Sequence, residues 1–279
     1  MNTTFATKSL LFTLALLAPQ LAQADPVWDR IESSGEIVCG AIPNDKIGSW
    51  TDPDSGEWLG YEIELCKNIA AGLSETMGKE IKPTYRETSW KTIVLDLQSE
   101  KIDLWPGMSA TEQRKQALSM IGPIYNLAFC GVERRGYEAG DTWDALNDPD
   151  VRIATVTGTS IEDLFKKMAP EATHLSLSEY AEVILATQSG RADVMGADIL
   201  RCLTVVNTAP DAFGDIVIPK PMHAAGSSAG VIKSADKLTA WLEDWAKQAK
   251  ESGKVTEIFL TTFEAAGLDA DKLPDDIEF

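Results

Sequence analysis

Histidine and closely paired cysteines are scarce in this sequence. It contains only two histidines, His174 and His223, and none of its four cysteines forms a C-x-x-C pair. A structural zinc site takes about four such ligands at close spacing, so zinc is not expected. A glycine-rich phosphate loop is absent as well. The sequence therefore predicts no metal and no other cofactor.

Basic residues are few compared with acidic ones. The chain has 25 Lys and Arg against 43 Asp and Glu, which gives a formal net charge of −18. Nucleic acids and anionic membrane surfaces attract proteins through positive charge. We therefore expect no nucleic-acid partner.

Long hydrophobic runs are also missing. A membrane helix takes about 18 or more uncharged apolar residues, and no segment reaches that length. The apolar run at residues 10–18 follows Lys8 and precedes the small residues Ala22 and Ala24. This order is typical of a secretory signal. We predict that residues 1–24 are a signal peptide cleaved after Ala24 and that the mature protein is soluble and periplasmic.

The cysteines are expected to form disulfides, because an exported chain enters an oxidising compartment. They are Cys39, Cys66, Cys130 and Cys202. Four cysteines allow three pairings, and their spacing alone does not choose among them.

Strand and helix patterns alternate along most of the chain. In the first half, strands are expected at residues 36–42, 81–87 and 101–109, with helices at residues 60–75 and after a Ser89 cap. In the second half, strands are expected at residues 151–159, 173–178 and 191–197, with helices at residues 160–168 and 179–188. Ser234 is expected to cap a further helix near the C-terminus. Two βαβαβ runs predict an α/β fold with two lobes, each built on a mainly parallel sheet.

Three short motifs resemble catalytic or metal sites without fitting them. In "GSSAG", Gly226–Gly230, both histidines precede Ser228, whereas the hydrolase order places the histidine after the serine. "SADK", from Ser234, is explained by the helix cap. "DPDSGE", from Asp52, lacks the glycine position and the closing ligand of a calcium loop. We interpret these segments as connections and turns.

Polar residues follow three of the predicted strands, where open α/β sheets bind ligands. They are Ser109 and Arg114, then Thr159 and Ser160, then Asp198. A helix N-terminus with an arginine beside it binds a carboxylate through N–H groups and a planar fork. An aspartate across a cleft would bind an ammonium group, because a desolvated charge needs a partner. Together these groups match an α-amino acid zwitterion.

Structural alternatives exist for both charged residues. Arg114 stands in the first turn of a helix that Thr111 caps, where the dipole disfavours a cation. It could be an exposed side chain paired with Glu112. Asp198 could serve as the N-cap of the helix that follows it.

The sequence resembles family 3 of the periplasmic solute-binding proteins of polar amino-acid ABC transporters. Four segments in the family's order carry the resemblance, namely "GYEIELCKNIA", "SWKTIVLDLQSEKIDLWPGMSATEQRK", "VTGTSIEDL" and "QSGRADVMGAD". The resemblance implies the type II periplasmic-binding-protein fold, with two lobes joined by two crossing strands. Lobe 1 would comprise residues 25–126 and 223–279, and lobe 2 residues 127–222.

By position in these motifs, Arg114 would bind the ligand's α-carboxylate with help from Ser109 and Thr159, in the turn that also holds Ser160. Asp198 would bind the α-ammonium, and Gly107 matches a position whose carbonyl often helps. This chain departs from the family pattern by an inserted Trp105-Pro106 and by lacking an aromatic residue after the first strand. Trp105 and Trp50 are therefore candidates for ligand contact or for the core, and Asp45 and Lys46 are possible polar contacts.

Within this framework we predict disulfides Cys39–Cys66 and Cys130–Cys202, because pairs inside one lobe leave the hinge free. The resemblance implies a monomeric exported receptor that passes its ligand to an ABC permease. Two alternatives are a lyase on the same scaffold, similar to cyclohexadienyl dehydratase, and a periplasmic ligand sensor. The lyase would need a free acid or base in the cleft, for which the candidates are Asp45, Glu62 and His223.

Overall fold

A computed structural model describes residues 25–268. The predicted signal peptide, residues 1–24, lies outside the described residues. The helices are α1 (Pro26–Ser34), α2 (Tyr61–Met77), α3 (Ile93–Gln98), α4 (Glu112–Ala117), α5 (Trp143–Leu146), α6 (Ser160–Met168), α7 (Tyr180–Gln188), α8 (Ile199–Thr208), α9 (Asp236–Glu251) and α10 (Lys254–Ala265). The strands are β1 (Glu36–Ala41), β2 (Trp50–Thr51), β3 (Trp58–Leu59), β4 (Lys82–Glu87), β5 (Trp105–Ser109), β6 (Leu118–Arg134), β7 (Arg152–Val156), β8 (Thr173–Leu177), β9 (Val194–Asp198), β10 (Phe213–Val217) and β11 (Ala224–Ile232).

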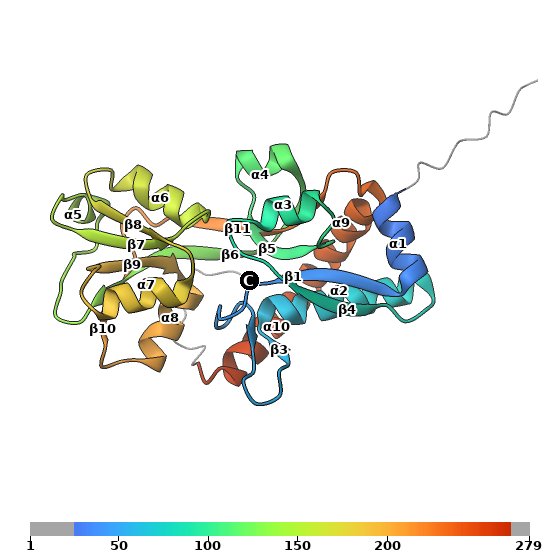
Figure 1. Cartoon of the computed structure of the whole chain (residues 1–279), viewed down its shortest axis with the longest axis horizontal. Helices are drawn as coiled ribbons and strands as arrows, with labels where there is room; N and C mark the ends of the chain where they lie inside the picture. The colour runs from blue at the N-terminus through green and yellow to red at the C-terminus, as the bar shows by residue number, and fades with distance from the viewer. Residues whose placement is uncertain (1–24, 269–279) are drawn as a thin grey trace, which may run out of the picture.

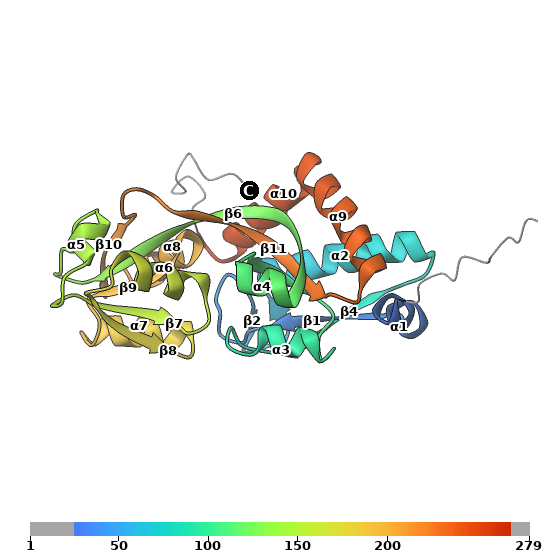
Figure 2. The same ribbon diagram turned by 90° about the horizontal axis from the view of Figure 1, so that it is seen from above.

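The elements form two groups joined by two long strands (Figure 1). One group contains α1 to α4, α9 and α10, and the other contains α5 to α8. β6 and β11 run antiparallel across the connection, from Leu118 opposite Ile232 to Ala128 opposite Ala224 (Figure 2). The predicted lobe boundaries, at residues 126/127 and 222/223, fall on or beside these strands and stay a prediction.

Parallel strand pairs form the centre of each group. β1 pairs with β4 in the first, and β7 pairs with β8 and β9 in the second. The antiparallel pairs mostly involve the connecting strands, since β6 continues from β11 to β9 and β10. Ser109 at the end of β5, Thr159 after β7 and Asp198 at the end of β9 line one cavity, so the loops that follow these strands face each other.

Two predicted helix starts need correction. α3 begins at Ile93 with Thr92 as N-cap, so the turn at Ser89 precedes the helix and leaves Trp90 outside it. α9 begins at Asp236 with Ala235 as its N-cap, one residue beyond the expected cap at Ser234. Its first turn donates backbone N–H groups to the carboxylate of Asp25, which also caps α1. Long-range capping of this kind leaves no local sequence signal.

Both predicted disulfides are confirmed. Cys39–Cys66 links β1 to α2, and Cys130–Cys202 links β6 to α8. Each pair lies within one predicted lobe, so neither bond crosses the cleft.

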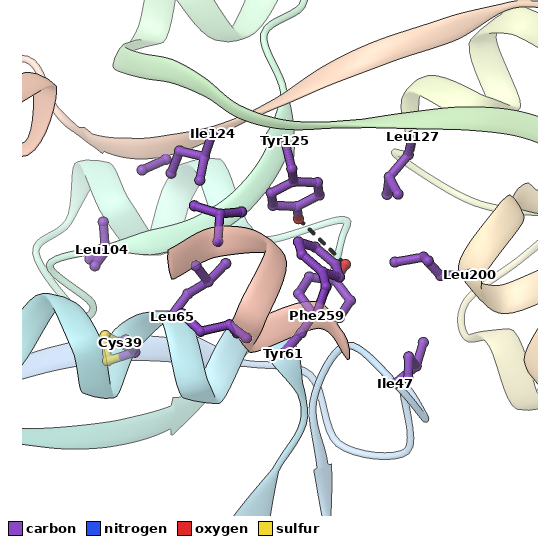
Figure 3. Packing of buried hydrophobic residues seen from close by; sticks show 14 of the residues in the cluster. Cys39, Ile47, Tyr61, Leu65, Leu104, Ile124, Tyr125, Leu127, Leu200 and Phe259 are labelled. Atoms are coloured by element: carbon purple, nitrogen blue, oxygen red, sulfur yellow. Dashed lines mark hydrogen bonds between the residues drawn. A yellow bond between two sulfur atoms is a disulfide. The ribbon is translucent and has the colours of Figure 1, made fainter. Parts of the chain in front are cut away.

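Aromatic rings from distant segments pack together in the core (Figure 3). The rings of Tyr61 on α2 and Tyr125 on β6 both lie 4.8 Å from that of Phe259 on α10, centroid to centroid. The Tyr125 hydroxyl donates to the Tyr61 hydroxyl at 3.4 Å. The C-terminal helices therefore pack on the group that contains α2. Within residues 25–268, no helix is both long and apolar enough to span a membrane.

Candidate functional site

A cavity of about 40 Å³ lies between the two groups of elements. It is lined by most of the predicted site residues and by several that were not predicted. The lining residues are Tyr61, Trp90, Gly107, Met108, Ser109, Arg114, Leu127, Phe129, Thr159, Ser160, Ile161, Tyr180, Asp198, Arg201, Ala225 and Ser227. We call this cavity the cleft. The structure thus brings Gly107, Ser109, Arg114, Thr159, Ser160 and Asp198 together from loops far apart in sequence.

Arg114 reaches across the cleft from the first turn of α4. Thr111 caps that helix, as predicted, by accepting from the backbone N–H of Arg114 at 3.3 Å. The guanidinium donates to the carbonyl oxygens of Ser109 and Gly158, each at 3.0 Å. The alternative pairing of Arg114 with Glu112 is wrong, because Glu112 pairs with Lys115 at 2.8 Å.

The Arg114 side chain is buried without an acidic partner. Only 6% of the residue is exposed, and it takes part in none of the ion pairs of the described residues. Burial lowers its pKa to about 10, and the field of Asp163 opposes that shift. A desolvated cation is unfavourable unless it is paired, so this position is complementary to an anion.

The turn after β7 supplies the facing wall. Thr159 caps α6 by accepting from the N–H of Glu162 at 3.1 Å, and the hydroxyls of Ser160 and Ser109 lie 2.8 Å apart across the cleft. The N–H groups of this helix end favour an anion in the same place as Arg114 does. Gly158 has a φ of 84°, and a Cβ there would lie 2.9 Å from the carbonyl oxygen of Trp90.

Asp198 holds the opposite side of the cleft, and it is also the N-cap of α8. Its Oδ1 accepts from the backbone N–H of Arg201 at 3.1 Å, so the capping alternative is confirmed. Its Oδ2 accepts from Nη1 of the same arginine. The guanidinium of Arg201 then continues to Asp45, donating from Nε to Oδ1 at 2.8 Å and from Nη2 to Oδ2.

The charges of this cluster do not balance. Burial would lower the pKa of Arg201, but Asp198 and Asp45 raise it well above its usual value, so the arginine stays charged. Nearby Glu62 is fully buried, and desolvation followed by the charge of Asp45 raises its pKa to about 8. With Glu62 protonated at neutral pH, two carboxylates face one guanidinium. Desolvation also raises the pKa of Asp45, and the charge and hydrogen bonds of Arg201 oppose that shift. With both aspartates paired to Arg201 as carboxylates, one negative charge is left for a cation.

The two tryptophan candidates lie outside the cleft lining. Trp105 is fully buried, and its Nε1 donates to the carbonyl oxygen of Gly107 at 2.8 Å. That bond uses one of the two acceptor positions of the carbonyl expected to help with the ligand's amine. Trp50 lines a second cavity of about 630 Å³, together with Asp45 and Lys46. Their contact with ligand stays a prediction.

Sequence reasoning missed several lining residues. Trp90 was assigned to a helix face, whereas it sits in the turn before α3, with its ring centroid 5.7 Å from the Arg114 guanidinium. Tyr180 begins α7 and stacks on Arg201 at 4.7 Å. Arg201 itself stands three residues after Asp198 on the first turn of α8, a spacing that could have marked it as a partner.

Two lobes joined by paired strands, with buried complementary charges between them, define a hinged protein that encloses a small ligand. The chain belongs to family 3 of the bacterial extracellular solute-binding proteins, whose sequence profile matches residues 41–265. This confirms the family expected from the four segments.

Relatives and solved structures agree with this placement. The glutamine-binding protein of an ABC transporter from Bacillus subtilis is 25% identical over 232 residues, or 82% of this chain and 81% of that protein. An ancestral amino-acid-binding protein, described as a precursor of cyclohexadienyl dehydratase, is 26% identical with a TM-score of 0.73, covering 85% of this chain and 98% of the other. A solute receptor for L-cysteine from Neisseria gonorrhoeae is 20% identical with a TM-score of 0.77, covering 91% and 100%. The predicted type II periplasmic-binding-protein fold is confirmed.

Proposed function

We propose that this protein captures a polar amino acid or a related zwitterion in its cleft and delivers it to an ABC permease. The family placement supports a solute-binding role, and several relatives are named for amino-acid transport. The observation that carries the proposal is the arrangement of charge. Arg114 is buried without an acidic partner, and on the other side of the cleft Asp198 shares Arg201 with Asp45, so that two carboxylates face one guanidinium.

The carboxylate of the ligand would take the Arg114 side of the cleft. There it would also accept hydrogen bonds from the hydroxyls of Ser109 and Ser160 and from the backbone N–H groups at the start of α6, the helix that Thr159 caps. The ammonium would take the Asp198 side. An ionised carboxylate has about four acceptor positions, and Arg201 uses two of those on Asp198. Capacity therefore remains for an ammonium group.

Delivery requires the lobes to close on the ligand and to open at the permease. β6 and β11 are the connections about which such a hinge would turn. The receptor would act as a periplasmic monomer after signal cleavage, and the net charge of −18 of the full sequence disfavours nucleic acid. A ligand sensor would bind in the same way and would differ in its protein partner.

The lyase alternative has less support. A dehydratase needs an acid or base that reaches the substrate. Of the three candidates, Asp45 is paired with Arg201, and neither Glu62 nor His223 belongs to the cleft lining. The likeness to a dehydratase precursor keeps the alternative in view, and an assay for loss of prephenate absorbance would reveal it.

Replacing Arg114 tests the proposal. In a thermal-shift panel of the common amino acids, we expect the wild type to be stabilised by at least one of them, and Arg114→Met to lose that shift. A lost charge-assisted contact costs about 3 kcal/mol or more, which is over a hundredfold in affinity. Lys115→Met, on the exposed side of the same helix, should keep the shift. An unchanged response of Arg114→Met would exclude this carboxylate site.

A further inference from the structure

The guanidinium of Arg201 is held between two carboxylates that come from opposite lobes. Asp198 lies at the end of β9, and Asp45 lies in the loop between β1 and β2. Asp45 receives the Nε and Nη2 groups side by side, which is the bidentate geometry that carboxylates use for guanidinium ligands. All three residues are at most 5% exposed. The chain thus contains a complete guanidinium site filled by its own side chain.

The loop that carries Asp45 is shaped for this contact. Ile47 is held at a φ of 83°, a conformation that a β-branched residue rarely adopts. Its carbonyl and that of Gly48 accept from the first N–H groups of α2, at 3.0 and 3.1 Å. A Cβ on Gly48 would lie 2.8 Å from Nη2 of Arg201. Strained backbone of this kind persists where surrounding contacts fix it and is common at ligand clamps.

Arg201 also separates two spaces. Its side chain lines the cleft of about 40 Å³ and the neighbouring cavity of about 630 Å³. The ring of Tyr180 lies against the guanidinium, 4.7 Å away, and lines both spaces as well. A ligand side chain leaving the cleft in this direction would therefore meet a guanidinium.

The cleft lining offers no second acidic group that could bind a cationic ligand side chain. Its charged lining residues are Arg114, Asp198 and Arg201, and the first two are assigned to the ligand's carboxylate and ammonium. We propose that Arg201 occupies the place of a cationic ligand side chain, so that this protein selects zwitterions with short, uncharged side chains and rejects arginine-like and lysine-like ones. This specificity rests on the proposed amino-acid function.

Ligand selection by the wild type is the first test. Calorimetric titration should show that small uncharged amino acids bind at least about a hundredfold more tightly than L-arginine or L-lysine, because two desolvated like charges repel. Comparable affinity for L-arginine would overturn the proposal without touching the proposed function.

Removing Arg201 is the second test. Arg201→Ala leaves two carboxylates facing an open space that joins the larger cavity. We expect millimolar ethylguanidinium to raise its melting temperature more than ethylammonium does, and to leave unchanged that of the wild type, whose guanidinium site is filled by Arg201. L-arginine should then bind at least tenfold more tightly than it binds the wild type. Arg152→Ala, which removes a guanidinium from Asp193 away from the cleft, is the matched control and should keep wild-type ligand selection.

The outcomes distinguish the proposed role of Arg201 in selecting ligands from the proposed amino-acid function. If Arg201→Ala proves too unstable to purify, Arg201→Met fills part of the space, and it should still show weaker discrimination against L-arginine. An Arg201→Met variant that discriminates as strongly as the wild type would contradict the proposal. If the wild type binds no amino acid while ethylguanidinium still stabilises Arg201→Ala, the guanidinium site is supported and the amino-acid function is wrong.

Discussion

The carboxyl group of Glu62 illustrates how single residues in this protein are tuned by burial. It lies on the first turn of α2, where Ser49 Oγ donates to its Oε2 at 3.3 Å and the Tyr61 hydroxyl donates to its Oε1 at 3.4 Å. Desolvation and the charge of Asp45 raise its pKa to about 8. At neutral pH the group is therefore protonated in the folded protein and ionised in the unfolded chain.

This raised pKa makes the free energy of unfolding depend on pH. Between the unfolded pKa, 4.5, and the folded value of about 8, the folded state holds one proton more than the unfolded state. Its contribution to stability therefore falls as pH rises, by about 1.4 kcal/mol per pH unit. Glu62→Gln should remove that slope in urea unfolding at pH 5 to 8, whereas Glu112→Gln, an exposed control, should keep it. Equal slopes in wild type and Glu62→Gln would show that Glu62 is ionised when folded.

At the scale of elements, the repeating patterns were predicted well and the exceptions have physical causes. Strands β1, β4, β7, β8 and β9 and helices α2, α6 and α7 follow from hydrophobic periodicity. β6 was expected only as one of the two crossing strands that the family resemblance implies and not from hydrophobic periodicity, since Gly122 and Pro123 interrupt its first half and resemble a turn. α3 starts late because Ser89 closes a turn ahead of it: the Ser89 carbonyl accepts from the N–H groups of Thr92 and Ile93, and the helix begins only at Ile93.

The turn before α6 limits how closely the two lobes can approach each other. Gly158 brings its backbone against Trp90 of the other lobe, so Gly158→Ala should hold the lobes apart and weaken binding at least about tenfold. Gly190→Ala is the control, because Gly190 has a similar φ of 72° and a Cβ added there would meet no atom within 4 Å. Binding of the best panel amino acid, measured by calorimetry, should therefore fall for the first variant only. Equal losses would mean that backbone strain, not lobe contact, sets the effect.

For the whole molecule, the sequence indicated two lobes and the side of the cleft that would bind the ligand's carboxylate. It did not reveal all the residues on the side that would bind the ammonium group. Arg114 and its cap were visible within one short segment. The partnership of Arg201 with Asp45 spans 156 residues, and neither residue carries a local pattern that points to the other. Contacts between lobes depend on how two folded units meet, and a single amino-acid sequence does not show that arrangement.

Calorimetric titration with modified ligands tests the central claim most directly. The amino acid that stabilises the wild type most would be compared with its methyl ester, which lacks the carboxylate charge, and with its des-amino analogue. Because Arg114 and the Asp198 side each need an opposite charge, we expect both analogues to bind at least about a hundredfold more weakly. Binding of the methyl ester as tight as that of the parent amino acid would contradict the account.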